Sequence, residues 1–361
     1  MKRTLRWLAI AILTPILLFI ILTALLYFPP IQNWAVKQVT AYASHETGMD
    51  ISIERVRLAF PLDLEVDGFK VLKGTLPAID TVADVKRLVA DVRLLPLLKG
   101  QVEIDALELN EARVNTLDFI PAARIRGDIG RLYLQSHGIN LKAETVKLNE
   151  AVIEHSRLDI ALSDSVPEDT TETTSDWKID IDKLALTKTR LTLHLPGDTI
   201  GVHTVMEHAI VRNAYLGLKD GLYQVGQLDW DGGSLDYGLG ISAFGRRDDS
   251  KRQRGFDADY LSMTDLHLGV DSLVVAMPQV SVKVRAASFK EKSGLDVRQF
   301  SGLFAMDDTK LSLSKAHVQT AHSSLDTDFQ MDLNTFDSEN PGMLYADIDG
   351  KIGKQDIQVF A

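Results

Sequence analysis

Residues 178–195 read KIDIDKLALTKTRLTLHL, and this stretch decides the fold class. Ile179 and Ile181, and then Leu191 and Leu193, alternate with polar residues. A period of two residues with one apolar and one polar face is typical of antiparallel strands buried on one side only. Similar windows occur at 51–53, 102–104, 146–148, 158–162 and 280–284. The pattern therefore predicts an all-β body over residues 49–361.

A weak repeat runs through this body, with the pattern L-x-L-(N/T)-x-(A/T)-x-hydrophobic. It reads LELNEARV at 107–114, VKLNEAVI at 146–153 and LALTKTRL at 184–191, with looser versions at 209–216 and 311–318. We interpret each copy as a strand, a tight polar turn and a second strand. Repeats spaced by 20 to 50 residues indicate arrays in which each unit buries its apolar face against its neighbours. The expected architecture is an elongated, curved antiparallel sheet.

An apolar segment precedes the body. Residues 8–28 carry no charge, and Lys2, Arg3 and Arg6 lie before them. At about 1.5 Å per residue such a helix crosses a hydrocarbon core of about 30 Å. The charge asymmetry places the N-terminus in the cytoplasm and the body outside it. We expect an uncleaved single-pass anchor over 1–30, with a cleaved signal peptide as the alternative.

The membrane-anchor residues are Trp7, Leu8 and Phe28, at the two ends of the apolar segment. After Pro29 and Pro30, apolar residues recur at helical spacing as far as Gly48. This pattern predicts a short amphipathic helix over 31–48. It would either cap one end of the β body or lie at the lipid interface.

Composition and motifs point away from catalysis. The chain has 361 residues, 45% hydrophobic and 25% charged, which predicts a folded protein, and its net charge of −11 argues against general nucleic-acid binding. With no cysteine, disulfides and thiolate chemistry are excluded. Residues 229–236 and 347–350 are similar to calcium loops but lack the full ligand set, so we interpret them as Asp-Gly hairpin turns. We predict no enzyme, no metal site and no cofactor.

Two N-terminal segments carry a family resemblance. Residues 28–71 (FPPIQNWAVKQVTAYASHETGMDISIERVRLAFPLDLEVDGFKV), residues 80–115 and the repeated L-x-L-N-x-A resemble the N-terminal part of TamB-like proteins in the AsmA-like family. The resemblance covers residues 1 to about 160. The predicted helix followed by ISIERV also resembles the start of bridge-like lipid transfer proteins.

The resemblance implies an inner-membrane protein with a periplasmic, U-shaped β-groove that is hydrophobic inside. The family is implicated in phospholipid transport toward the outer membrane, and in assembling outer-membrane and secreted proteins with a TamA-type barrel. Family members are several times longer, so we expect this chain to be an N-terminal part. Contact with the barrel would depend on a C-terminal region beyond it.

The leading hypothesis is a phospholipid conduit between the inner and outer membranes, in which acyl chains lie against the apolar face of the strands. A closed sandwich would show the same alternation. A scaffold whose strand edges template incoming proteins by β-augmentation is the alternative function. The expected groove lining is Val102, Ile104, Val146, Leu148, Ile160, Leu162, Ile179, Ile181, Leu191 and Leu193.

Overall fold

The computed structural model describes residues 29–59, 63–75, 78–93, 104–117, 123–140, 144–162, 177–194, 200–217, 219–239, 255–257 and 259–360. These residues form strands and two helices, and the chain divides into two compact units, Met1–Arg113 and Val114–Ala361. The predicted membrane span at 8–28, with Trp7, Leu8 and Phe28, lies outside the described residues. Within the ranges above, no helix is long and apolar enough to cross a membrane.

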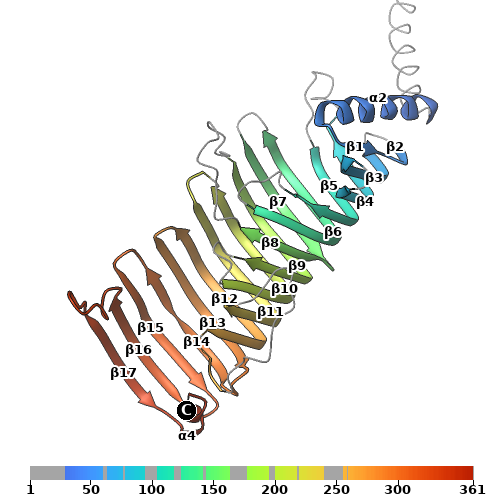
Figure 1. Ribbon diagram of the computed structural model, residues 1–361. Coiled ribbons are helices and arrows are strands. Elements are labelled where there is room, and N and C mark those ends of the chain that lie inside the picture. Colours follow the sequence, from blue (N-terminus) through green and yellow to red (C-terminus); the bar gives the residue numbers. More distant parts are fainter. Residues whose placement is uncertain are drawn as a thin grey trace, which may run out of the picture. The chain divides into compact units, whose positions relative to one another are not determined.

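The first unit contains helix α2 and the strands that follow it. Its elements are α2 (Pro29–Thr47), β1 (Asp50–Ser52), β2 (Arg55–Ala59), β3 (Asp63–Thr75) and β4 (Ala78–Val92), and β5 (Ile104–Asn115) reaches the unit boundary. β1 and β2 both pair antiparallel with β3, and β3 pairs antiparallel with β4. A helix therefore lies where the sequence predicted one, and α2 packs against β1 and β2 (Figure 1).

The second unit is one long run of strands. They are β6 (Ala123–Asn140), β7 (Thr145–Glu154), β8 (Arg157–Leu162), β9 (Lys178–His194), β10 (Ile200–Gly217), β11 (Leu222–Leu239), β12 (Tyr260–Ala276), β13 (Gln279–Glu291), β14 (Asp296–Met306), β15 (Lys310–Thr320), β16 (Ser324–Asp332) and β17 (Leu344–Lys351). From β9 onward each strand pairs antiparallel with the next. The all-β prediction and the long, mostly antiparallel sheet are confirmed.

Two strands beside β9 pair with it in parallel. β7 and β8 lie one after the other between β6 and β9, antiparallel to β6 and parallel to β9. Thr145 lies opposite Lys178, and Ile160 lies opposite Leu193. Parallel neighbours require the chain to cross back before it re-enters the sheet. The alternation of apolar and polar residues could not predict this pairing, because parallel and antiparallel strands show the same alternation.

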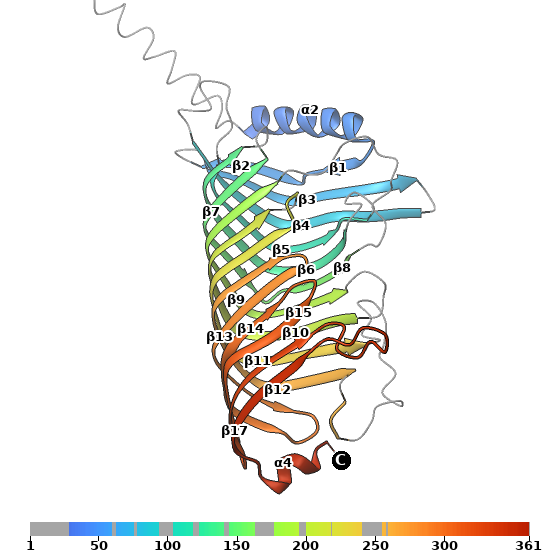
Figure 2. The ribbon, with the colours of Figure 1, turned by 90° about the vertical axis from the view of Figure 1, so that its left-hand side faces the viewer.

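Strands of the second unit contain positions where two consecutive residues point to the same side. In β10, Met206 and Ala209 are buried, whereas Glu207 and His208 between them are both exposed. The apolar side chains are therefore three residues apart at this point instead of two. Extra residues of this kind bend a strand locally. Figure 2 shows that the strands of this unit are bent.

These three-residue steps lie side by side on neighbouring strands and form two rows. Because adjacent strands take the extra residue at the same place, their pairing stays in register from β9 to β11. Row A consists of the steps Ile153/Ser156, Leu186/Thr189, Met206/Ala209, Trp230/Gly233 and Met263/Leu266. Row B consists of Leu148/Ala151, Ile181/Leu184, Val211/Ala214, Val225/Leu228, Val270/Leu273 and Val284/Ala287. A similar step, Leu313/Ala316, lies on β15, beyond β14, whose Gly302 and Phe304 keep the two-residue spacing at this place.

The repeated motif produces a bend within one strand, so its interpretation as strand, turn, strand is wrong. Each copy lies inside a single strand: β5, β7, β9, β10 or β15. In four copies the fifth residue has a left-handed backbone, with φ between 47° and 53°, and a buried small residue follows it. These pairs are Glu111-Ala112, Lys188-Thr189, Asn213-Ala214 and Lys315-Ala316. The left-handed residue redirects the chain, and the small side chain returns to the apolar face without crowding it.

The predicted Asp-Gly hairpin turns are also wrong. Residues 229–236 lie within β11 and residues 347–350 within β17. Gly233 contributes to row A, and a Cβ there would overlap the carbonyl oxygen of Val205. The glycines therefore allow close approach of neighbouring strands instead of reversing the chain.

Gly130 of β6 lies against His155, the residue between β7 and β8 that has a left-handed backbone. A Cβ at Gly130 would lie 2.7 Å from the carbonyl oxygen of His155, whose φ is 51°. We predict that Gly130→Ala lowers the free energy of unfolding by about 1–3 kcal/mol, because backbone must move to admit the methyl group. His155→Gly should leave stability unchanged or raise it, because an L-residue in this conformation costs about 1–2 kcal/mol. Urea unfolding of the two variants checks both signs; equal destabilisation would contradict this account of the bend.

The C-terminal residues form a helix where alternation predicted a strand. α4 (Lys354–Gln358) docks on the β15–β16 turn through Asp356, which accepts hydrogen bonds from the hydroxyls of Thr320 and Ser323. The Ser323 hydroxyl in turn accepts a hydrogen bond from the Gly353 amide at 3.0 Å. Burial by itself would raise the pKa of Asp356, but the bonds from Ser323 and Thr320 outweigh it and lower the pKa.

This lowered pKa gives a pH dependence. The stabilisation from the Asp356 carboxylate is present above the unfolded pKa of about 3.9 and is lost as the pH falls through the lower folded value. We predict that Asp356→Asn lowers the thermal midpoint at pH 7 and that the difference from the parent chain shrinks toward pH 3. Asp308→Asn, at an exposed position in the turn between β14 and β15, is the control and should leave the thermal midpoint unchanged. A pH-independent loss in Asp356→Asn would assign the effect to packing instead.

Candidate functional site: the uncharged face of the sheet

One face of the second unit carries almost no charge. Residues paired across strands share a face, so the register identifies its members: Leu186 pairs with Ala209, and Ala209 pairs with Trp230. We call this the uncharged face. From β7 to β16 its register positions hold apolar residues, glycine, serine and threonine, except at one end of β13.

Glu291 is that exception. It is the last residue of β13 and pairs with Met263. Its carboxylate accepts hydrogen bonds from the backbone amides of Ser293, at 2.7 Å, and Ser262, at 3.4 Å. The charge therefore lies at the end of the strand, bound by the adjoining backbone, and does not interrupt the middle of the uncharged face.

The structure brings most of the predicted lining together on this face. Val146 pairs with Ile179, Leu148 with Ile181 and Ile160 with Leu193, all between β7–β8 and β9. Leu191 pairs with Leu158 on the same ladder. Leu148 is buried and the other six are half-buried.

Three predicted lining residues stand apart. Val102 lies outside the described residues. Leu162 ends β8, where its backbone pairs with Ala123. Ile104 begins β5 and is half-buried, and it belongs to the first unit.

Sequence reasoning missed the extension of this face over β10–β16. Its members there include Val202, Met206, Ala209, Val211, Leu228, Leu235, Leu268, Val282, Phe304 and Phe329. Strict two-residue alternation does not connect these positions, because each three-residue step moves the apolar residues from even to odd numbers or back. A spacing that alternates between two and three would have found them.

The middle of the face is packed and its ends are open. Within β11, Trp230 is 7% exposed, whereas Tyr223 and Tyr237 near the two ends of the strand are 39% and 37% exposed. Met206, Ala209, Trp230 and Leu266 form a buried cluster at row A. The Trp230 indole donates a 2.9 Å hydrogen bond to the Gly232 carbonyl, which satisfies its buried N–H.

The opposite face carries ion pairs. Arg285 reaches Asp229 at 2.5 Å and Asp271 at 2.6 Å, and Asp229 also contacts Arg212 at 2.9 Å. Lys283 approaches Asp271 at 3.5 Å. The hydrogen bond from Arg285 lowers the pKa of Asp271. This chain of charges connects β10, β11, β12 and β13 on the side that faces water.

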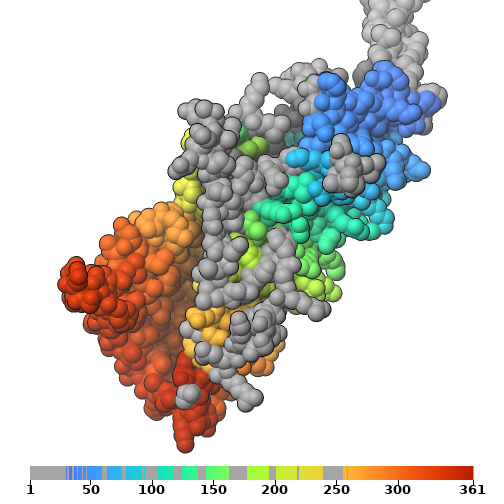
Figure 3. Space-filling model, viewed as in Figure 1, coloured from blue at the N-terminus to red at the C-terminus, as the bar shows by residue number. Residues whose placement is uncertain are grey.

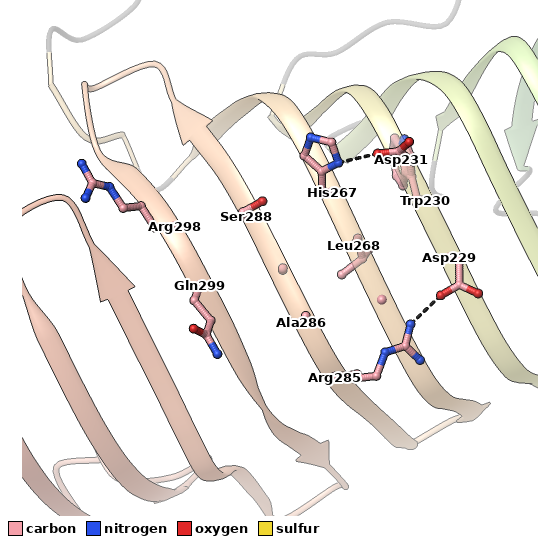
Figure 4. A pocket seen from close by; sticks show the side chains of 12 residues that line it. Asp229, Trp230, Asp231, His267, Leu268, Arg285, Ala286, Ser288, Arg298 and Gln299 are labelled. Carbon is pink, nitrogen blue, oxygen red and sulfur yellow. Dashed lines mark hydrogen bonds and ion pairs between the residues drawn. The ribbon is translucent and has the colours of Figure 1, made fainter.

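A shallow cavity of about 290 Å³ lies in this charged face (Figure 4). Its hollow is over Gly269 and Ala286, and Arg285 crosses it to reach Asp229. His267 Nδ1 lies 2.6 Å from Asp231 Oδ1 at its edge. A Cβ at Gly269 would lie 2.6 Å from the Arg285 guanidinium, so the glycine opens a path for this ion pair. Both carboxylates of the lining are paired, Asp229 with Arg285 and Asp231 with His267, so the uncharged face is the stronger candidate site.

Comparison with known proteins adds no family assignment. The sequence matches no protein-family model and no curated protein. The resemblance to TamB-like proteins therefore stays an expectation carried by the quoted N-terminal segments.

The difference between the middle and the ends of β11 can be tested with two aromatic residues on the same face. We predict that Trp230→Ala lowers the free energy of unfolding by about 3–5 kcal/mol, since it leaves a cavity in a packed cluster. Tyr223→Ala should cost clearly less, because its side chain already contacts water. Urea unfolding followed by far-ultraviolet circular dichroism measures both, and equal losses would show that the face is packed over its whole width.

Proposed function

We propose that the chain is a non-enzymatic conduit for phospholipids. The bent strands would form a hydrophobic, U-shaped groove in which acyl chains lie on the uncharged face and head groups stay in water at the open ends. The observation that carries the proposal is the continuity of this face from β7 to β16, with its one carboxylate, Glu291, at an end. No second sheet covers this face among the described residues.

Continuity of the uncharged face matters for transport because it keeps the free energy of a bound lipid nearly constant along the path. Each CH₂ moved from water to an apolar surface contributes about 0.8 kcal/mol to binding. A lipid that moves to a neighbouring strand with the same chemistry keeps this contribution. An unpaired charge within the path would instead cost several kcal/mol. A lipid could therefore move from strand to strand without meeting a large barrier.

The cellular setting follows from the N-terminal segment. With residues 8–28 inserted in the inner membrane and the basic residues before them in the cytoplasm, the β body would lie in the periplasm. A TamA-type outer-membrane barrel is the partner that the family resemblance suggests.

A scaffold for protein assembly is the second candidate, and the edge of β17 favours it. All eight residues of β17 are exposed, including Leu344, Tyr345 and Ile348. In the described part of the chain, β17 pairs on one side with β16 and with no strand on its other side. An exposed edge of this kind can add a strand from another protein.

Site-specific photo-crosslinking in cells distinguishes the two functions. A benzoylphenylalanine at Leu193 reports on the uncharged face, and the same residue at Arg190 of β9 is the matched control on the charged face. The conduit predicts a phospholipid adduct at Leu193 and none at Arg190. A third probe at Tyr345 reports on the β17 edge. Protein adducts at Tyr345 without lipid at Leu193 would favour the scaffold and contradict the conduit.

A charge placed on the path should block it. We predict that Leu184→Asp, in the middle of the uncharged face, folds, because the side chain is only half-buried, but that phospholipid adducts at a benzoylphenylalanine in place of Leu193 and lipid transfer between vesicles fall at least tenfold. The matched control is Gln224→Asp, an exposed position on the charged face of β11, which should transfer lipid normally. Circular dichroism confirms that both variants fold. A folded Leu184→Asp chain with full transfer would overturn the conduit.

A further inference from the structure

Helix α2 turns its smaller side chains toward the sheet. Gln32, Val36, Thr40 and Ser44 recur every four residues and are buried or half-buried. The Ser44 hydroxyl accepts a 3.0 Å hydrogen bond from the amide of Ile51 in β1. α2 contacts β1 and β2, so this side of the helix is the one that packs on its unit.

The opposite side of α2 exposes two large aromatic residues. Trp34 is 64% exposed and Tyr42 is 68% exposed. They are eight residues apart, which on a helix is about 12 Å along one side. Gln38 and Ala41 lie between them and are also exposed. In the space-filling view α2 (blue) lies at the surface of its unit (Figure 3).

The aromatic residues on this side suit a membrane surface. The exposed side chains described on α2 include Lys37 and His45, and the sequence of the helix contains one acidic residue, Glu46, in its last turn. Tryptophan and tyrosine favour the layer of lipid head groups, where the ring is apolar and its polar atom meets water. Lysine adds attraction to phosphate groups.

The sequence before α2 supplies the membrane. The uncharged stretch 8–28 ends at Phe28, and α2 begins at Pro29. If residues 8–28 cross the bilayer, no linker separates the end of the span from the start of α2. The helix must then begin at the bilayer surface. Its side chains decide whether it runs along that surface or away from it.

We infer that α2 lies in the interfacial layer of the bilayer, with Trp34 and Tyr42 among the lipid head groups and the opposite side packed on β1 and β2. This inference rests on the insertion of residues 8–28 in the proposed function. It places the first strands of the body next to the head groups. The occupant of this surface is the lipid bilayer that holds the anchor.

The absence of cysteine allows a direct test by site-directed spin labelling. The full chain carrying Gln38→Cys is reconstituted in vesicles of phosphatidylethanolamine and phosphatidylglycerol at a 3:1 ratio. Collision rates with oxygen, which partitions into lipid, and with a water-soluble nickel chelate report the depth of the label. Ser338→Cys, an exposed position between β16 and β17, gives the reference for a label in water.

We predict that the Gln38 label collides less with the nickel chelate and more with oxygen than the Ser338 label. Trp34→Ser combined with Tyr42→Ser should bring the Gln38 label to the reference values, because the two rings hold the helix in the interface. Phe336→Ser, which removes a ring that is 83% exposed far from α2 in sequence, is the matched control and should change nothing.

Three results would count against the inference. A Gln38 label as accessible to nickel as the Ser338 label, in a chain that resists carbonate extraction, would overturn the interfacial position alone and leave the conduit intact. A depth that is unchanged in the Trp34→Ser, Tyr42→Ser double variant would remove the role of the two rings. A chain that carbonate extracts would overturn the membrane anchor, and with it both this inference and the inner-membrane setting of the conduit.

Discussion

The strands that form rows A and B must keep one face almost free of charge on both sides of a bend. A strand with strict alternation keeps its apolar residues on one face only while successive residues point to opposite faces. At a bend, one extra residue would move every later side chain to the wrong face unless the sequence shifts its pattern by one. Residues 178–195 contain two such shifts, at Ile181/Leu184 and Leu186/Thr189. The other strands of rows A and B follow the same rule.

Neighbouring strands satisfy this constraint together. When β9 and β10 both take the extra residue at row A, their pairing is preserved, and the bend continues from strand to strand. The price is local strain: residues such as Lys188 and Asn213 adopt a left-handed backbone that L-amino acids disfavour by about 1–2 kcal/mol. Continuous cross-strand hydrogen bonding and the buried small residues beside them offset it. Where strands approach most closely, as at Gly130 and Gly233, only glycine fits.

This arrangement separates two kinds of surface. The uncharged face can hold acyl chains because carboxylates and amines are directed to the other side, where Arg285 and its partners pair in contact with water. The proposed conduit needs that separation over many strands and needs no catalytic group. The interfacial position inferred for α2 adds the other requirement of such a protein, which is a fixed contact between its first strands and a lipid source.

The sequence by itself determined the all-β class, the helix before it and the apolar face of β7–β9, because local alternation and helical periodicity survive any tertiary arrangement. Only the tertiary structure decided that β7–β8 and β9 are parallel, since alternation is the same in both ladders. It also showed that the repeats are bends within long strands. Their polar residues suit a turn equally well, and only the neighbouring strand, which pairs with both halves of the repeat, excludes a turn. The full width of the uncharged face depends on those bends, and so it could not be deduced from a two-residue period.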